Sequence, residues 1–240
     1  MKILAIDTTA KTATAAITEN ERLIGLTVLN TPNTHSVTLL PMINGLLSGA
    51  SLTLGDIDLL VCSSGPGSFT GVRIGAATVK GLAFADSKPC IGVSSLEALA
   101  LGITEADGII CPVMDARRNQ LYNALFTYEN GKLKRLTPDR VLTAAELAAE
   151  LSGAPVTVHL TGDGTAIAQR ALEGADIRLA HEVLRYHNAY GVALLGYREY
   201  EAMTEDEKAL CTAAKLSPVY LRASQAERER LERLEKENKN

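Results

Sequence analysis

The same order of apolar segments occurs twice along this chain of 240 residues. In the first half, the hydrophobic pattern predicts three strands, a helix, a strand and a helix at residues 2–7, 13–18, 21–29, 36–47, 58–63 and 72–85. A short strand at 89–93 and a helix at 96–99 follow. The second half repeats the order with strands at 109–114, 123–125 and 132–136, a helix at 144–151 and a further apolar run from 156.

Two details support this alignment of the halves. Asp7 and Asp115 each end the first strand of their half, and the glycines that follow the later strand fall in register. A repeat this long predicts duplicated subdomains rather than a solenoid. We therefore expect an α/β fold with two subdomains, at 1–104 and 105–225, each a mixed sheet with flanking helices. A tail at 226–240 carries five basic and five acidic side chains and few apolar ones.

Composition and cysteine spacing indicate the compartment. Cys62, Cys90 and Cys111 lie in apolar runs, and the four cysteines form no C-x-x-C pair, so free thiols in a reducing cytoplasm are expected. Met1-Lys2 leads directly into a strand, without the pattern of a signal peptide. Because no apolar run approaches the length that crosses a bilayer, we expect no membrane association.

The segment Gly65-Pro66-Gly67-Ser68-Phe69-Thr70-Gly71-Val72-Arg73-Ile74-Gly75 connects a buried strand to a helix. Its glycines permit positive φ and close backbone approach, and Ser68 or Thr70 can cap the helix. Such a turn could hold an anion on its free N–H groups. However, it lacks the Lys-Ser/Thr ending of a P-loop and the glycine spacing of the dinucleotide fingerprint. A structural turn is therefore favoured over a phosphate site.

This segment closely resembles the signature of the TsaB (YeaZ) family. Further segments agree, namely Ile3-Leu4-Ala5-Ile6-Asp7-Thr8, His35-Ser36, Leu40-Pro41, Ser94-Ser95-Leu96-Glu97-Ala98-Leu99, Met114-Asp115-Ala116-Arg117-Arg118 and Pro218-Val219-Tyr220-Leu221-Arg222. The resemblance implies a bacterial protein that helps to place threonylcarbamoyl on the adenosine beside the anticodon of tRNA. It also implies the duplicated, ribonuclease H-like fold of actin, the sugar kinases and the Hsp70 ATPase domain.

Actin-like enzymes bind nucleotide between their subdomains, with the hairpin turns around the phosphates. Here the turns read Asp7-Thr8-Thr9-Ala10-Lys11-Thr12 and Asp115-Ala116-Arg117-Arg118-Asn119-Gln120, both without glycine. Asp7, Thr8, Thr9 and Asp115 are thus candidates for a vestigial cleft, and we favour turn-capping roles for both aspartates. We expect no cofactor, although an actin-like ATPase or kinase remains an alternative.

Catalytic and metal sites have little support in the sequence. The histidines form no H-x-x-x-H or H-E-x-x-H pair, whereas the catalytic relative TsaD carries a paired-histidine metal motif. We expect His35 at a helix start or interface, His159 in the core, and His181 and His187 at the surface. Ser68 lacks the G-x-S-x-G order of a nucleophile elbow. We therefore expect neither a catalytic residue nor a metal ligand, and the alternative of an M22-type glycoprotease is disfavoured.

The helices at 36–47 and 72–85 carry more apolar or small residues than one buried face needs. Leu39, Ile43, Leu46 and Leu47 fit a core-facing stripe, and Val37, Leu40 and Met42 extend beyond it. Gly71, Gly75, Ala76, Ala77 and Gly81 would let another helix approach closely. From the residues alone, an internal core is the simpler interpretation of both helices.

The resemblance implies instead that both helices pair with TsaD, that the ATPase TsaE joins nearby, and that the chain self-associates as a homodimer without TsaD. The expected interface residues are His35, Ser36, Leu39, Leu40, Ile43, Arg73, Ala76, Ala77 and Lys80. Gly65, Gly67, Ser68, Phe69, Thr70 and Gly71 would shape the adjoining loop. The net charge of −4 argues against this chain as the main holder of tRNA, so we expect tRNA contact only through the complex.

Overall fold

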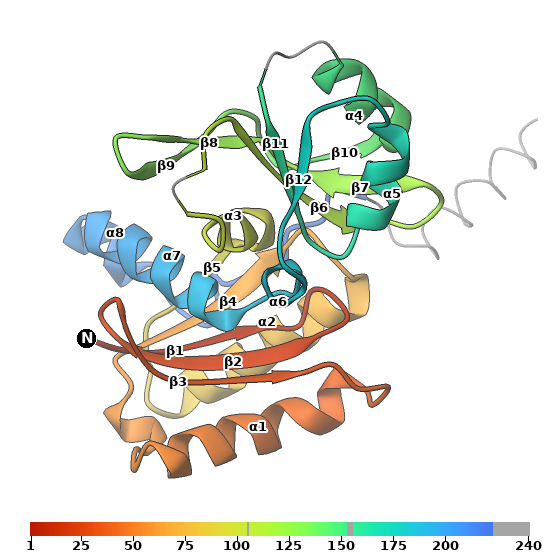
Figure 1. Ribbon diagram of the computed structural model, residues 1–240. Coiled ribbons are helices and arrows are strands. Elements are labelled where there is room, and N and C mark those ends of the chain that lie inside the picture. The colour runs from red at the N-terminus through yellow and green to blue at the C-terminus, as the bar shows by residue number, and fades with distance from the viewer. Residues whose placement is uncertain (105, 153–155, 223–240) are drawn as a thin grey trace, which may run out of the picture.

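The computed structural model describes residues 1–104, 106–152 and 156–222. The predicted tail at 226–240 lies outside the described residues. Within them the chain forms two mixed sheets with helices on their faces (Figure 1), which confirms the expected fold class.

The first sheet contains five strands in the order β3-β2-β1-β4-β5. These are β1 (Lys2–Asp7), β2 (Ala13–Glu19), β3 (Arg22–Leu29), β4 (Leu59–Gly65) and β5 (Cys90–Ser94). β1 pairs antiparallel with β2 and parallel with β4. The sheet is therefore antiparallel from β3 to β1 and parallel from β1 to β5. The helices of this half are α1 (His35–Gly49), α2 (Phe69–Ala85) and α3 (Ser95–Ala100), with a 3₁₀ turn at Leu54–Asp56.

The second sheet repeats this order as β10-β7-β6-β11-β12. Its strands are β6 (Ile109–Asp115), β7 (Gln120–Asn123), β10 (Arg140–Thr143), β11 (Val158–Thr161) and β12 (Ile177–Leu179). β8 (Phe126–Glu129) and β9 (Lys132–Arg135) form a hairpin beside β6. The helices are α4 (Ala144–Leu151), α5 (Thr165–Ala171), α6 (Glu182–Arg185), α7 (Ala189–Ala202) and α8 (Glu205–Ala209).

The return strand predicted at 123–125 was wrong, whereas the strand predicted at 132–136 is present as β9 but does not hold the third position in the sheet. The return strand is β7 and ends at Asn123, and the third position in the sheet belongs to β10 instead of residues 132–136. The physical reason is the apolar content of the competing segments. β10 contributes the buried Leu142 to the core, whereas Leu133, the one apolar residue of β9, is only partly buried.

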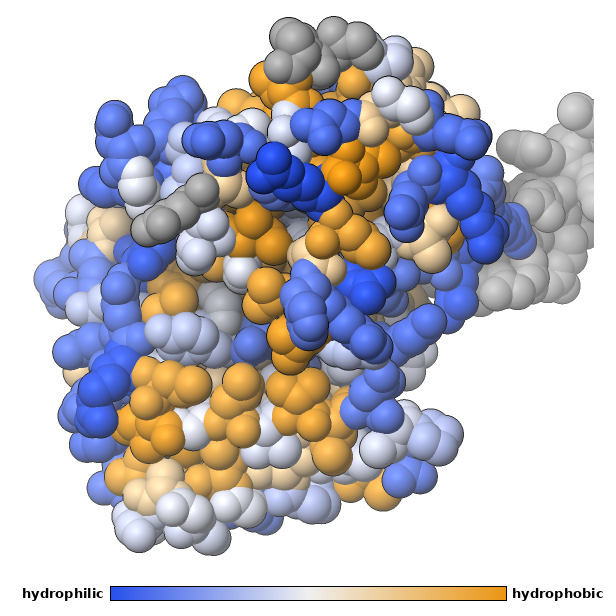
Figure 2. Space-filling view, viewed as in Figure 1, coloured by the Kyte–Doolittle hydropathy of each residue, from blue (hydrophilic) through white to orange (hydrophobic). Residues whose placement is uncertain are grey.

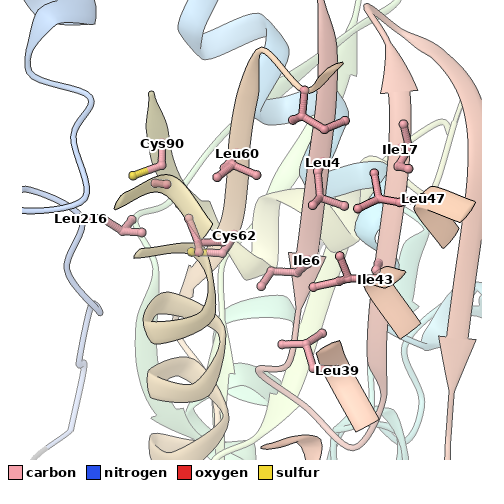
Figure 3. Close-up of a cluster of buried hydrophobic side chains, with 14 residues drawn as sticks. Leu4, Ile6, Ile17, Leu39, Ile43, Leu47, Leu60, Cys62, Cys90 and Leu216 are labelled. Carbon is pink, nitrogen blue, oxygen red and sulfur yellow. The ribbon is translucent and has the colours of Figure 1, made fainter. Parts of the chain in front are cut away.

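Helices and sheets alternate in layers (Figure 1). α1 and α2 cover one face of the first sheet, and α3 and α7 fill the space between the two sheets. α4 and α5 cover the outer face of the second sheet. Figure 3 shows the first of these cores, in which α1 directs its side chains at the sheet: Leu39, Ile43 and Leu47 face Leu4, Ile6 and Ile17.

α3 and α7 cross between the halves of the chain. α7 lies in the predicted second subdomain, yet Val192 and Ala193 pack on Ile3 and Val61 of the first sheet. α3 belongs to the first half and places Leu96 against the second sheet. Each sheet therefore receives part of its cover from the other half of the sequence.

A charge network also links the halves. The guanidinium of Arg135 in β9 lies 2.5 Å from a carboxylate oxygen of Glu97 in α3 and 2.5 Å from one of Asp139. Ser94, which caps α3, donates a hydrogen bond of 2.6 Å to Asp139. Glu199 of α7 lies close enough to Glu97 for that charge to act on it, and burial followed by the Glu97 charge raises the pKa of Glu199 to about 7.

Candidate functional site

The glycine-rich loop packs directly on the first hairpin turn. Ser68 N–H donates to the Thr9 carbonyl at 2.7 Å, and Thr8 Oγ1 donates to the Gly71 carbonyl at 2.7 Å. A Cβ atom on Gly67 would lie 2.6 Å from Cβ of Thr9, and one on Gly71 would overlap the Thr8 carbonyl. Glycine at these two positions therefore lets the loop backbone approach the hairpin turn closely, in agreement with the structural interpretation of this turn.

The loop also starts the second helix. α2 begins at Phe69, and Ser68 caps it by accepting a hydrogen bond from Gly71 N–H at 3.3 Å. Thr70 is exposed in the first turn of the helix, so the cap is Ser68 and not Thr70. Since a serine cap uses its oxygen on the helix N–H groups, Ser68 has a structural use that requires no reaction.

The late segment around Tyr220 closes over this loop. Val219 N–H donates to the Ser64 carbonyl at 2.7 Å, next to Gly65, whose φ of +127° favours glycine. The ring centroids of Phe69 and Tyr220 are 5.0 Å apart. Arg73 Nε donates to the Tyr220 hydroxyl at 2.7 Å, and its guanidinium lies 3.7 Å from the Phe69 centroid. Two segments far apart in sequence thus form one surface beside α2.

Asp7 is enclosed in its own hairpin turn and only 1% exposed. Its Oδ1 accepts hydrogen bonds from Thr9 N–H and Thr9 Oγ1, both at 2.7 Å. Its Oδ2 accepts from Ser63 Oγ at 2.5 Å and from His187 Nδ1 at 3.1 Å. Burial alone would raise the pKa of Asp7, but the charge of His187 and the hydrogen bonds outweigh burial and lower it. Asp7 is therefore an internal carboxylate whose two oxygens are both hydrogen-bonded.

His187 was wrongly predicted at the surface, since it is only 2% exposed. The segment before α7 crosses under the first hairpin turn, where Thr12 Oγ1 donates to the His187 carbonyl at 3.5 Å. Burial would lower the pKa of the imidazole, but the charge and hydrogen bond of Asp7, with the charge of Asp163, raise it. His187 and Asp7 thus form a buried ion pair. The polar composition around residue 187 does not indicate a buried ion pair. Its acidic partner lies 180 residues away in the sequence, so the pair forms no recognisable motif.

The second hairpin turn repeats the first in part. Asp115 Oδ1 accepts from Arg117 N–H at 2.7 Å, as Asp7 does from the residue two positions later. Arg117, Arg118 and Asn119 have φ values of 66°, 55° and 57°, so three successive residues adopt the left-handed conformation. Asp115 is partly exposed and lines a cavity of about 400 Å³ with residues of the first turn and the glycine-rich loop. Among the cleft candidates, Asp7, Thr8 and Thr9 are buried.

The predicted interface residues divide into buried and exposed sets. Leu39, Ile43 and Ala76 are buried within the chain's own core, as is Met42, which was expected to extend the outer apolar surface. Ser36, Leu40, Arg73 and Ala77 are exposed, and His35 and Lys80 are partly exposed.

Sequence reasoning missed the most exposed aromatic residue on this side. Phe84 in α2 is 82% exposed, while Val37 and Leu40 in α1 are 66% and 47% exposed. A Cβ atom on Gly45 or Gly81 would meet nothing within 4 Å among the described residues. The helical spacing of Ala77, Gly81 and Phe84 would have placed these residues on one face.

The remaining histidines have local structural roles. His35 begins α1, as expected, and its Nε2 lies 2.9 Å from the Ala10 carbonyl. His159 is half-buried with its Nε2 2.9 Å from the Asp107 carbonyl. Across the described ranges, no group of three or more histidine, cysteine or acidic residues could hold a metal ion. No helix in the same ranges is long and apolar enough to cross a membrane.

Comparisons with known proteins agree with these features. A family model described as TsaD, tRNA N6-adenosine threonylcarbamoyltransferase, matches residues 13–230. The tRNA threonylcarbamoyladenosine biosynthesis protein TsaB of Bacillus subtilis is 34% identical over 229 residues, which cover 95% of this chain and 96% of that protein. The chain belongs to the TsaB family. TsaB of Escherichia coli is 36% identical over 164 residues, which cover 66% of this chain and 71% of that protein.

Solved structures with a similar fold include YeaZ and a protein of a different description. YeaZ from Pseudomonas aeruginosa superposes with a TM-score of 0.75 and 26% identity, covering 92% of this chain and 99% of that one. Component A of (R)-2-hydroxyglutaryl-CoA dehydratase from Acidaminococcus fermentans has a TM-score of 0.51 at 14% identity, over 83% of this chain and 98% of that one. The latter likeness concerns the fold alone and supports the actin-like architecture.

Proposed function

We propose that this TsaB-family chain is a non-catalytic subunit of the tRNA threonylcarbamoyladenosine machinery that binds and activates the transferase TsaD, together with the ATPase TsaE. The observation that carries this proposal is the outer face of α1 and α2, where apolar side chains and open glycines point away from the chain's own core. The net charge of −4 does not favour direct binding of tRNA phosphates, so tRNA would be reached through the complex.

The face suits a helical partner. Val37, Leu40 and Phe84 supply apolar surface, and the absence of side chains at Gly45 and Gly81 would let a partner helix approach closely. A stable interface buries about 800 Å² per partner, which two helix faces can provide. When TsaD is absent, a second copy of this chain would cover the same face, giving a homodimer.

The cleft supports the non-catalytic part of the proposal. A carboxylate that holds Mg²⁺ in a nucleotide site needs oxygens free to face the metal. Both oxygens of Asp7 instead accept hydrogen bonds from Ser63, Thr9 and His187. Asp115 accepts from Arg117 N–H and lies 3.5 Å from the Arg117 guanidinium. Neither hairpin turn offers the glycine backbone that approaches phosphates closely.

Size-exclusion chromatography with light scattering tests the proposal, using this chain alone and mixed with TsaD. Leu40→Glu places a charge on the proposed face, and we expect it to abolish the heterodimer because an unpaired buried charge is costly. Leu210→Glu is the matched control, since Leu210 is 60% exposed at the C-terminal cap of α8 and its substitution should leave the complex intact.

Failure of the wild-type chain to form a complex with TsaD would refute the proposal. Equal loss of complex with both variants would assign the effect to general instability, so circular dichroism of each variant accompanies the measurement. The catalytic alternative is tested by titrating the isolated chain with ATP and Mg²⁺. Nucleotide turnover by this chain alone would overturn its assignment as non-catalytic.

A further inference from the structure

β3 is an edge strand that lacks the features by which proteins usually protect such a strand. It lies at one end of the first sheet and pairs only with β2 in the part of the chain that the structure describes. Its outer edge therefore offers backbone N–H and C=O groups to another strand. Natural edges are blunted by short strands, charged side chains, proline or a covering segment. In β3 the one charged residue is Arg22, at its first position, and residues 23–29 contain no proline.

The strands at the other ends of the two sheets are better protected. β5, at the opposite end of the first sheet, is covered by a later segment, because Cys90 N–H donates to the Cys211 carbonyl at 2.8 Å. β10 and β12, at the ends of the second sheet, have four and three residues and carry Arg140 and Arg178. β3 has eight residues. Among these four strands of the described chain, β3 is therefore the longest and the one with an open, uncharged edge.

Apolar surface follows this edge. Leu23 and Val28 are 40% and 41% exposed, and Leu26 between them is partly exposed. Figure 2 shows apolar surface gathered in the lower part of the view, where Figure 1 draws β3 above α1. Contiguous apolar surface on a chain of this kind marks an interaction site more often than isolated apolar residues do.

A groove of about 370 Å³ lies between β3 and α1. Residues 24–27 of the strand form one wall, and Pro41, Met42, Gly45, Leu46, Gly49 and Ala50 form the other. None of these residues is charged. Two glycines keep the groove open, because a Cβ atom on Gly25 would lie 2.8 Å from Leu46 Cδ1 and one on Gly49 would meet nothing within 4 Å among the described residues. A strand added beside β3 can therefore direct alternate side chains into this groove.

We propose that an extended, uncharged segment of a partner protein adds to β3 as a further strand of the first sheet. Large apolar side chains at alternate positions of the segment fill the groove against α1, and the side chains between them cover Leu23 and Val28. Backbone hydrogen bonds supply the affinity of such an addition, and the groove selects the side chains. The site goes beyond the proposed function, because it uses the sheet edge instead of the outer face of α1 and α2.

A second copy of this chain fits the groove less well than such a segment. If two β3 strands paired about a two-fold axis, the two β2 strands would lie three strand spacings apart, about 14 Å. Because α1 packs mainly on β2, the two α1 helices would be separated by a similar distance, beyond the roughly 8–10 Å of packed helices. The second β3 would direct Gly25 and Thr27 to the groove side, since these residues pair with Ile17 and Ala15 of the core under α1. Both are too small to fill the space.

Hydrogen–deuterium exchange of the full chain locates an added strand. The probe is a synthetic peptide of about nine alternating leucine and threonine residues, with lysines at both ends for solubility. We expect saturable protection of the backbone amides of residues 22–29, with the edge strand β12 unchanged as the internal control. The same peptide with prolines at two adjacent central positions lacks N–H donors on both of its edges, so it should give no protection.

Gly49→Leu fills the groove from the side of α1. The substitution should leave the fold intact, because the new side chain meets open space and leucine favours a helix more than glycine does. We expect the affinity for the labelled leucine–threonine peptide, measured by fluorescence anisotropy, to fall at least about tenfold, because one buried leucine contributes more than that factor. Ser48→Leu is the matched control and should bind as the wild type does, since Ser48 is exposed on the same helix and does not line the groove.

Four results would overturn the proposal. The first is the absence of protection in residues 22–29 with the leucine–threonine peptide, and the second is equal protection by the proline peptide. The third is equal affinity of Gly49→Leu and the wild type. The fourth is protection of β3 that rises with chain concentration when no peptide is present, because it would assign this edge to a second copy.

Discussion

Replacing His187 with leucine tests whether the buried pair with Asp7 stabilises the fold. The substitution keeps an apolar side chain of moderate size and removes the donor that lies 3.1 Å from Asp7 Oδ2. Breaking a buried ion pair by deleting one partner costs about 3–5 kcal/mol, because the other charge stays buried without compensation. Asp7 would keep its three hydrogen bonds from Thr9 and Ser63, so we expect a loss at the lower end, about 3 kcal/mol.

The pH dependence gives this prediction a definite sign. The folded pKa of His187 is raised above its ordinary 6.5, so its contribution is complete below that value and is lost as pH rises through the folded pKa. The folded pKa of Asp7 is lowered below 3.8, so its contribution is lost only as pH falls below that value. The stability difference between the wild type and His187→Leu should therefore be largest between about pH 4 and 6.5.

Urea unfolding, followed by circular dichroism at about pH 5.5 and about pH 9, measures this difference. His181→Leu is the matched control, because His181 is exposed and makes no side-chain cap hydrogen bond at the start of α6. A loss below about 0.5 kcal/mol for His187→Leu would refute the reasoning, since surface substitutions alone reach that size. A difference that grows with pH would refute the assignment of an imidazolium.

Three further predictions concern packing and titration. Gly71→Ala should lower the free energy of unfolding by about 3 kcal/mol in urea, because the added Cβ overlaps a backbone carbonyl. Gly81→Ala in the same helix should raise it by about 0.5–1 kcal/mol. Equal effects of the two substitutions would contradict the close-approach argument. Burial raises the pKa of Cys111 to about 12, so its thiol should resist iodoacetamide at about pH 8 until the chain unfolds, as mass spectrometry would detect. Glu199→Gln removes a carboxyl whose pKa is raised to about 7 by burial and by the charge of Glu97. Its thermal midpoint should exceed that of the wild type at about pH 8, by an amount equivalent to ~1 kcal/mol, and match it at about pH 5.

The sequence predicts local structure well where one physical requirement dominates. Every predicted strand of the first half is present: the apolar runs of β1, β2 and β4 are buried on both faces, and the more exposed β3 follows β2 after a tight turn. The glycine-rich loop was predicted to be a strand-to-helix turn, and it connects β4 to α2. At Gly67 and Gly71 the requirement is steric and local, and only glycine meets it.

Features that depend on contacts between residues far apart in the sequence could not be predicted in this way. The choice of β10 over residues 132–136 is decided by which segment buries Leu142 in a core built from other elements. His187 is buried because Asp7 attracts it from the opposite half of the chain. The outer face of α1 and α2 was predicted only partly, because apolar residues such as Ile43 fit either a core or an interface until the neighbouring sheet is known.

The exchange of helices between the halves has a consequence for synthesis on the ribosome. When translation has passed residue 104, the first sheet is complete in sequence, but the face formed by Ile3 and Val61 still lacks α7. That face stays uncovered until residue 202 has been synthesised. The nascent chain therefore exposes an apolar strand surface during nearly half of its elongation. A product that terminates early exposes the same surface, which makes it a substrate for chaperones and proteases. Although the topology is duplicated, the chain therefore reaches its native state as a single unit.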